Sequence, residues 1–331
     1  MTAAVIRGPR DLRIEQLPEP VAGPGEIVIR TLAASICNAT DVHIWEGSLG
    51  EELRPPYPHV LGHERVGVVV ALGADVTGFA VGDRVSCWAK MDGAFGEYDV
   101  LRPSQYPTVR LSDGVSSDAG SLLELVGATL RCMHASGLRP GERVLILGQG
   151  VQGLVLAREA KLLGAGLVAT VDLLASRLDR SRAMGSDVAY DLSGKRYDEA
   201  LAELRDAVGG EVDLVIDASG RGTWEGGNSV NLALELLRWA GRYVVYGLPT
   251  HDVSVNARMV GVKGITFKGI DTPPHEVRAL LALGERWVAE GRLALEGLVT
   301  HRVPLERVAE GLALCRDRPA EVLKVMVEFE G

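Results

Sequence analysis

The chain has 331 residues, of which 47% are hydrophobic and 24% charged, a composition typical of a soluble globular protein with room for two domains. Its formal net charge of −9 argues against a nucleic-acid-binding protein, which needs a basic face to displace counterions from phosphates. No apolar run reaches the roughly 18 residues of a membrane span, and the N-terminal segment lacks the apolar core of a signal peptide, so we expect a cytoplasmic protein without membrane contact.

The first part of the chain, up to about residue 110, predicts short strands separated by turns rich in glycine and proline. Its β-type runs are rich in β-branched residues and are bounded by turn signals. They span residues 26–34, 64–72, 83–89 and 96–101. Because the gaps between turns are short, this pattern favours an antiparallel barrel or sandwich.

The pattern changes near residue 112, and helical spacing then runs through residues 116–137. Beyond this helix, apolar strands alternate with helices. The strands are expected at 142–148, 167–173, 212–220 and 242–248, and the helices at 151–165, 175–185, 199–210 and 231–241. Such alternation predicts a parallel sheet with helices on both faces. From about residue 272 the sequence predicts a long helix, a strand, a second helix and a last strand.

A glycine motif follows the first strand of this alternating region and opens the next helix, as a dinucleotide-binding fingerprint requires. Gly148 is expected to form the tight turn. Gly150, followed by Val151 at the start of the helix, would let the backbone approach a pyrophosphate at the positive helix terminus. Gly153 would allow the helix to pack closely on the sheet. These four residues are therefore candidate cofactor contacts.

The next strand ends in Asp172, 19 residues after Gly153. In dinucleotide-binding folds, an acid about 20 residues after the glycines binds the adenosine ribose hydroxyls. A carboxylate there would repel a 2′-phosphate, so we expect NAD rather than NADP. Arg177, five residues later, carries the opposite charge, which weakens the expected preference for NAD over NADP. The alternative is a glycine-rich turn in a doubly wound domain that binds no cofactor, but strand, glycines, helix and acid all coincide here.

Polar residues that suit a metal site lie within the predicted β region. Cys37 and His63 are plausible ligands of a catalytic zinc, which takes three protein ligands and keeps one position open. Each also has a simpler interpretation. Cysteine in an apolar segment is usually a small buried hydrophobe, and His63 could cap a turn. Spacing alone does not decide between these interpretations.

Several motifs make the whole chain resemble the medium-chain dehydrogenase/reductase superfamily, in particular its zinc-dependent alcohol, sorbitol and threonine dehydrogenase branch. They include "LGHERVGVV", "GAFGEY", "LVIDASG" and "VTHRVPLERVAEGL". The resemblance implies a catalytic domain with a GroES-like antiparallel β-barrel, and a Rossmann domain with a doubly wound parallel sheet that binds NAD. The expected boundaries are 1–125 and 272–331 for the catalytic domain and 126–271 for the Rossmann domain.

The resemblance also implies the metal ligands: Cys37, His63 and Glu124. Glu64, next to His63, is expected as an optional ligand that exchanges with water. Asp41 is expected to orient the ligand histidine, as carboxylates commonly do beside zinc. It could at the same time serve as a helix cap or turn residue.

The chain departs from the family pattern in two places. One extra residue follows Cys37. We expect Thr40 to take the substrate proton and His43 to pass it toward solvent. The extra residue shifts both positions relative to the family pattern. A surface position on a loop is an alternative for His43. The four-cysteine lobe of a structural zinc is missing, so we expect one catalytic zinc and three core cysteines, at positions 87, 132 and 315.

The function implied by the resemblance is zinc- and NAD-dependent interconversion of an alcohol, polyol- or sugar-like, and its ketone or aldehyde. The expected partners are a small-molecule substrate and further copies of the chain in a homodimer or homotetramer. One alternative is a zinc-free, NADPH-dependent quinone or enoyl reductase with the same fold. Another is a binding protein that has lost activity. The candidate ligands, the glycines and Asp172 argue against both.

Overall fold

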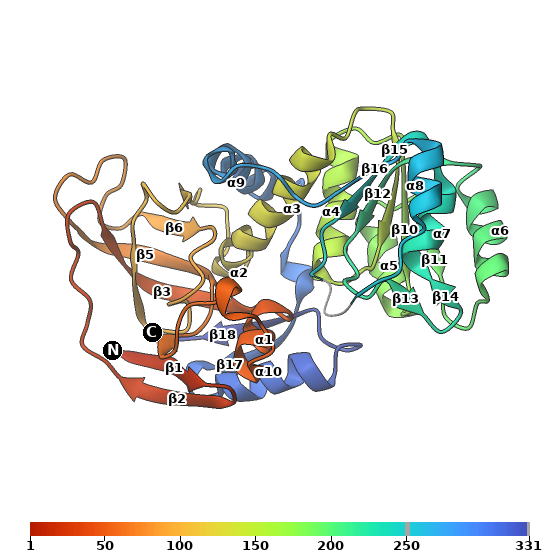
Figure 1. The fold of residues 1–331 in the computed structure, drawn as a ribbon. Coiled ribbons are helices and arrows are strands. Elements are labelled where there is room, and N and C mark those ends of the chain that lie inside the picture. Colours follow the sequence, from red (N-terminus) through yellow and green to blue (C-terminus); the bar gives the residue numbers. More distant parts are fainter. Residues whose placement is uncertain (249–251, 330–331) are drawn as a thin grey trace. The chain divides into compact units, whose positions relative to one another are not determined.

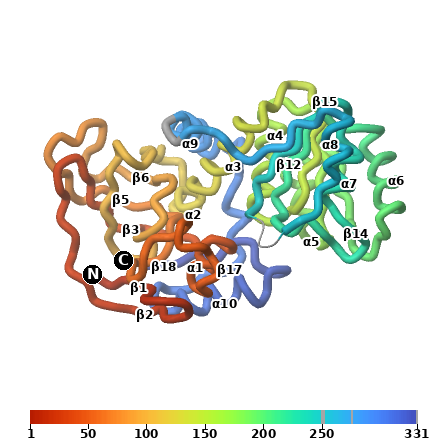
Figure 2. The backbone as a smooth tube through the Cα atoms, in the orientation of Figure 1, coloured from red at the N-terminus to blue at the C-terminus, as the bar shows by residue number. Residues whose placement is uncertain are grey.

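The computed structural model describes residues 1–248 and 252–329. The chain divides into two compact units, one formed by residues 1–128 and 273–331 and the other by residues 129–272. These divisions lie one to three residues beyond those expected from the sequence. Figure 2 traces the path, which runs through the first unit from red to yellow, through the second in green, and back into the first in blue.

The first unit is built on a seven-stranded sheet and a small three-stranded sheet, and among its described residues only one pair of strands, β17 and β18, is parallel. The long sheet has the order β17-β18-β3-β5-β6-β8, with β7 also paired to β3. Its strands are β3 (Ile27–Ile36), β5 (Glu64–Leu72), β6 (Arg84–Cys87), β7 (Tyr98–Leu101), β8 (Thr108–Arg110), β17 (Val299–Pro304) and β18 (Lys324–Glu328). The small sheet contains β1 (Thr2–Gly8), β2 (Asp11–Gln16) and β4 (His59–Val60).

Most helices of this unit pack against its strands (Figure 1). They are α1 (Thr40–Glu46), α2 (Ser117–Ser121), α9 (Pro274–Ala289) and α10 (Val308–Asp317), with α3 (Leu123–Ser136) continuing into the second unit. The single helix predicted over 116–137 is therefore two helices. The break falls at Leu122, whose backbone N–H bonds to Ala119 in a tight turn, and it places Glu124 in the first turn of α3.

The second unit is a parallel six-stranded sheet in the order β11-β10-β9-β12-β15-β16. Its strands are β9 (Arg143–Leu147), β10 (Leu167–Asp172), β11 (Val188–Asp191), β12 (Val212–Asp217), β15 (Leu237–Val245) and β16 (Thr266–Lys268), and a hairpin of β13 (Thr223–Trp224) and β14 (Gly227–Asn228) is attached. Within this sheet the chain starts at β9 in the middle and continues outward through β10 to β11. It then returns to the other side of β9 with β12. Carboxyl ends of strands flank the resulting crevice, where doubly wound sheets bind ligands.

Helices cover both faces of this sheet (Figure 1), because alternate residues of each strand point to opposite sides. They are α4 (Val151–Leu162), α5 (Ala175–Ala183), α6 (Tyr197–Ala207), α7 (Ser229–Leu236) and α8 (Ala257–Lys263). In β9, Val144 and Ile146 pack with α4, whereas Leu145 and Leu147 join the core under α6 and α7. Within the described residues, no helix is long and apolar enough to cross a membrane.

Candidate functional site

Three side chains with metal-binding atoms meet in the first unit. The ligand atoms of Cys37, His63 and Glu64 all lie within 4.8 Å of one another, and all three residues are buried. Strand pairing brings them together. Cys37 directly follows β3, His63 directly precedes β5, and the antiparallel register of the two strands sets Ser35 opposite Glu64. Three of the four predicted ligands therefore converge.

Asp41, on α1, forms hydrogen bonds with two of these candidate ligands. Its Oδ1 lies 2.9 Å from Nδ1 of His63, and its Oδ2 accepts a 2.8 Å hydrogen bond from the backbone N–H of Cys37. A carboxylate only accepts, so when the ring is neutral its proton stays on Nδ1 and the lone pair of Nε2 is left for a metal. Burial alone would lower the pKa of His63, but Asp41 and the Cys37 thiol outweigh it and raise that pKa well above its usual range. The site thus attracts positive charge.

Glu64 has a cationic partner of its own. Nζ of Lys324, on β18, lies 2.5 and 2.6 Å from the two carboxylate oxygens of Glu64 and donates to the Ile36 carbonyl at 3.1 Å. The hydroxyl of Ser35 also donates to Glu64. Lys324 is fully buried, and although burial lowers the pKa of its ammonium, Glu64 and Cys37 raise it overall. The negative charge of Glu64 is therefore balanced by the ammonium group of Lys324.

Glu124 lies outside the group of three, but the charges of His63 and Glu64 act on it. The pKa of Glu124 is raised to about 7, mainly by burial; His63 and Lys324 lower it and the charge of Glu64 raises it. A buried carboxyl group with such a pKa can become an anion at neutral pH when a cation arrives. Of the predicted ligands, Glu124 is the one that the structure does not bring into the group.

The predicted proton carriers both lie on α1. Thr40 is its first residue and is partly exposed, and Nδ1 of His43, one turn later, lies 2.8 Å from the Ser48 hydroxyl. The extra residue after Cys37 is accommodated in the turn before α1, and Asp41 still reaches both Cys37 and His63. In that turn, Oδ1 of Asn38 is buried and has no hydrogen-bond partner among the described residues.

The glycine motif of the second unit has the geometry predicted for it. Gly148 has φ 85°, and a Cβ there would lie 2.8 Å from the backbone of Ser219. A Cβ on Gly153 would overlap the carbonyl oxygen of Gly148. Gly150, the N-cap of α4, faces open space, and Val151 begins the helix. The helix N-terminus is therefore accessible to an anion, and two of the three glycines leave no room for a side chain.

Asp172 closes β10 beside this turn and is heavily hydrogen-bonded. Its Oδ2 accepts from the backbone of Gln149 at 2.6 Å, and its Oδ1 accepts from Leu173 at 2.7 Å and Leu174 at 2.9 Å. Nη1 of Arg177 lies 3.8 Å away. The backbone donors hold the carboxylate in one orientation at the carboxyl end of the sheet, where a ribose would be recognised.

A cavity of 270 Å³ lies in the second unit and is lined mostly by apolar residues, among them Val230, Tyr243, Val245 and Phe267. Asp217, Gly220 and Gly247 line it from the carboxyl ends of β12 and β15. The Tyr243 hydroxyl donates to Asp217 at 2.8 Å.

Two residues near these sites escaped the sequence analysis. Lys324 is 260 positions from Glu64, and the only hint was a lysine within an otherwise apolar strand. Gln149 is buried, and its side-chain oxygen has no hydrogen-bond partner in the described structure. It occupies the variable position between Gly148 and Gly150, where the motif puts no constraint on the residue.

Residues 23–130 match the family described as alcohol dehydrogenase GroES-like domain, and residues 152–286 match zinc-binding dehydrogenase. Sorbitol dehydrogenase of Bos taurus is 30% identical over 360 residues, covering 98% of this chain and 95% of its own length. Sorbitol dehydrogenase of Ovis aries is 29% identical over 356 residues, covering 98% of this chain and 96% of its own. The structure of 2R,3R-butanediol dehydrogenase from Bacillus subtilis is similar with a TM-score of 0.84 at 25% identity, covering 99% of each chain.

These similarities extend over both units. They confirm the predicted fold, a GroES-like β domain combined with a Rossmann domain whose sheet is parallel. The sheet of the first unit is mixed rather than wholly antiparallel, because the returning C-terminal segment adds β17 parallel to β18.

Proposed function

Because the chain belongs to the family of zinc-binding medium-chain alcohol and sorbitol dehydrogenases, we propose that it interconverts an alcohol and its carbonyl compound by hydride transfer. The resemblance of its motifs to this family is confirmed by the same comparisons. Relatives named for sorbitol and for butanediol favour a secondary alcohol of polyol type as the substrate.

The donor set of the first unit fits zinc. A thiol, an imidazole whose Nε2 is free once the ring is neutral, and carboxylates are the ligand types that zinc prefers. We propose Cys37 and His63 as constant ligands. Glu124 or Glu64 would be the third, with Glu64 reaching the metal only when it leaves Lys324. We propose no structural zinc for this chain; Cys87, Cys132 and Cys315 are free and buried.

The open turn at Gly150 and the carboxylate of Asp172 fit a dinucleotide. The pyrophosphate would lie against the N-terminus of α4, and Asp172 would accept hydrogen bonds from the adenosine ribose. Asp172 would also repel the 2′-phosphate of NADP, since three backbone donors hold its charge in place, so we propose NAD. Arg177, whose Nη1 lies 3.8 Å from Asp172, would bind the cofactor beside that carboxylate.

In the proposed reaction the residues of this chain bind, orient and move protons. Zinc, when bound, would supply Lewis acidity that favours loss of the alcohol proton, and NAD would supply the hydride acceptor. Asp41 keeps the imidazole of His63 in the metal-binding tautomer. Thr40 takes the proton from the substrate hydroxyl, and His43 passes it on through Ser48, its hydrogen-bond partner.

The observation that supports this proposal most strongly is the position of Asp41, which holds both Cys37 and His63. The test is metal analysis of the purified protein, followed by an alcohol, polyol and cyclitol panel monitored as NADH absorbance with and without a chelator. Cys37→Ala should abolish zinc binding and turnover, whereas Cys132→Ala, another free buried thiol, should keep both. A fully active Cys37→Ala protein, or activity with NADPH and no metal, would favour the zinc-free reductase instead.

We further propose a homodimer or homotetramer in the cytoplasm. β16 is an edge strand of the six-stranded sheet and presents the partly exposed Phe267, with Val262 exposed on the adjacent α8. Edge strands with exposed apolar residues favour pairing with another chain. The four free cysteines suit a reducing compartment.

A further inference from the structure

A buried arginine lies two residues after the candidate ligand His63. Arg65 has no solvent exposure. Its Nη1 donates to Asp99, and its Nη2 donates to the backbone carbonyls of Lys90, at 2.6 Å, and of His63, at 3.3 Å. We propose that Arg65 is a positioning residue for the metal ligand His63, acting through the backbone carbonyl of that histidine. This inference rests on the proposed function, because it concerns the same metal site.

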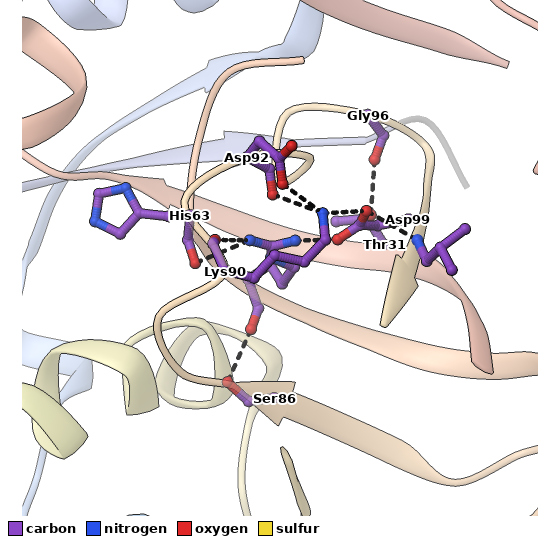
Figure 3. Close-up of polar contacts among 9 residues, drawn as sticks. Thr31, His63, Ser86, Lys90, Asp92, Gly96 and Asp99 are labelled. Atoms are coloured by element: carbon purple, nitrogen blue, oxygen red, sulfur yellow. Dashed lines mark hydrogen bonds and ion pairs between the residues drawn. The ribbon is translucent and has the colours of Figure 1, made fainter. Parts of the chain in front are cut away.

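The guanidinium is itself fixed by a network of charges. Asp99, on β7, accepts from Arg65, from Nζ of Lys90 at 2.9 Å and from the backbone of Val100 at 2.8 Å. Lys90 in turn binds the carboxylate of Asp92 at 2.7 Å. Figure 3 shows these contacts, with the imidazole of His63 pointing away from the network and its backbone carbonyl facing it. The network therefore approaches His63 from the side opposite to its ring.

His63 is consequently held at three separate points. Asp41 binds the ring, as described above. Before it, Gly62 has φ 92°, and the ring of Phe95 lies so close that a Cβ on Gly62 would be 2.7 Å from it. After the ring and the preceding glycine, the third point is the backbone carbonyl of His63, which accepts a hydrogen bond from Arg65. Together these contacts determine both the ring orientation and the backbone position, which a metal ligand needs within a fraction of an ångström.

Stability alone is a weak reason for such a network. Replacing a buried ion pair by apolar residues is often neutral or even stabilising, because desolvation offsets the attraction between the charges. What a planar guanidinium adds is geometry, since it can bind a carboxylate and two carbonyls at once in fixed directions. Here those three acceptors come from β7, from the loop that contains Lys90 and from the residue before β5.

The test uses the full chain, with Co²⁺ as the metal probe. The main variant is Arg65→Met; Arg65→Met/Asp99→Asn also removes the buried charge that would otherwise be left unpaired. The control is Arg242→Met/Glu142→Gln, which removes a largely buried ion pair in the second unit. Metal affinity is measured by competition with a chelator, the visible spectrum reports the cobalt–thiolate geometry, and denaturant unfolding of the metal-free protein reports stability.

We expect both Arg65 variants to bind Co²⁺ about 10- to 100-fold more weakly than the parent, as for loss of other groups that orient ligands, with an altered visible spectrum. The control should lose stability and keep both the affinity and the spectrum. Should the two variants fail to fold, Arg65→Lys, which keeps the charge and loses the fork, is expected to show the same weakening. Unchanged affinity and spectrum in a folded Arg65 variant would overturn the inference. Failure of the parent itself to bind metal would instead reject the proposed function.

Discussion

Lys324 binds both carboxylate oxygens of Glu64, at 2.5 and 2.6 Å, although Glu64 lies in the group of side chains that could hold a metal. The two residues have opposite charges and are both buried. A cation that binds Cys37 and His63 therefore competes with Lys324 for Glu64. This competition decides whether Glu64 can act as a ligand, and the outcome depends on the charge of one lysine.

Lys324→Met should destabilise the metal-free protein by about 3–5 kcal/mol, because Glu64 is left as an uncompensated buried charge. Zinc should restore more stability in this variant than in the parent, since Glu64 is free to bind it. The measurement is denaturant unfolding with and without zinc. Lys263→Met is the control: Lys263 bonds the carbonyls of Leu234 and Leu237 in the second unit, far from any candidate ligand in sequence. Equal gains from zinc in variant and parent would contradict the competition.

Asp41→Asn should weaken zinc binding by about 10- to 100-fold. An amide that donates to Nδ1 of His63 would move the imidazole proton to Nε2, which is the atom the metal needs. It would also lower the pKa of His63, because Asp41 holds that pKa above its usual range despite burial. Zinc affinity by chelator competition and the His63 titration by NMR are the two measurements. Asp187→Asn, which removes a backbone-bonded carboxylate in the second unit, should change neither.

Asp172→Ser should raise the KM for NAD about 10- to 100-fold, the usual range for losing a hydrogen bond to a charged group. The discrimination against NADP should shrink, since the repulsion of its 2′-phosphate is gone while Arg177 remains. Initial rates with both cofactors measure this. The matched control is Asp191→Ser, because Asp191 lies opposite Asp172 on the neighbouring strand. A similar loss in both variants would show that Asp172 has no particular role in recognising the ribose.

Glu159→Gln should make the protein more stable at neutral and alkaline pH. Glu159 is fully buried on α4, accepts from Thr129 at 2.8 Å and has a second oxygen without a hydrogen-bond partner among the described residues. Burial holds the pKa of Glu159 well above its usual value, so the folded state keeps a proton that the unfolded state releases. The stability that this neutral acid provides is therefore complete below about pH 4.5 and is lost as the pH rises toward the folded pKa.

Unfolding free energies across the pH range test this prediction. The variant should match the parent well below pH 4.5, where Glu159 is protonated in both the folded and the unfolded state, and exceed it increasingly at higher pH. A constant difference at all pH values would mean that packing, and not ionisation, accounts for the change.

Local patterns predicted those parts of the site whose geometry is set within a short segment. Gly153 is constrained by the backbone of Gly148 five residues before it, and Asp172 follows the next strand of the same unit. Asp41 lies four residues after Cys37, so its contact with the backbone of Cys37 is local too. The break at Leu122 was not foreseen, because leucine is itself a strong helix former and gives no stop signal.

By itself, the sequence determined the two-unit architecture, the dinucleotide motif and the candidate ligands Cys37 and His63, since periodicity and short motifs carry that information. Only the tertiary structure decided which charges meet behind these ligands. Lys324 reaches Glu64 because β18, formed near the end of the chain, pairs with β3, and Arg65 reaches Asp99 because β3 pairs with both β5 and β7. A buried charge has no preferred partner in a sequence. The partner is set by strand register, which brings together residues that are far apart in the chain.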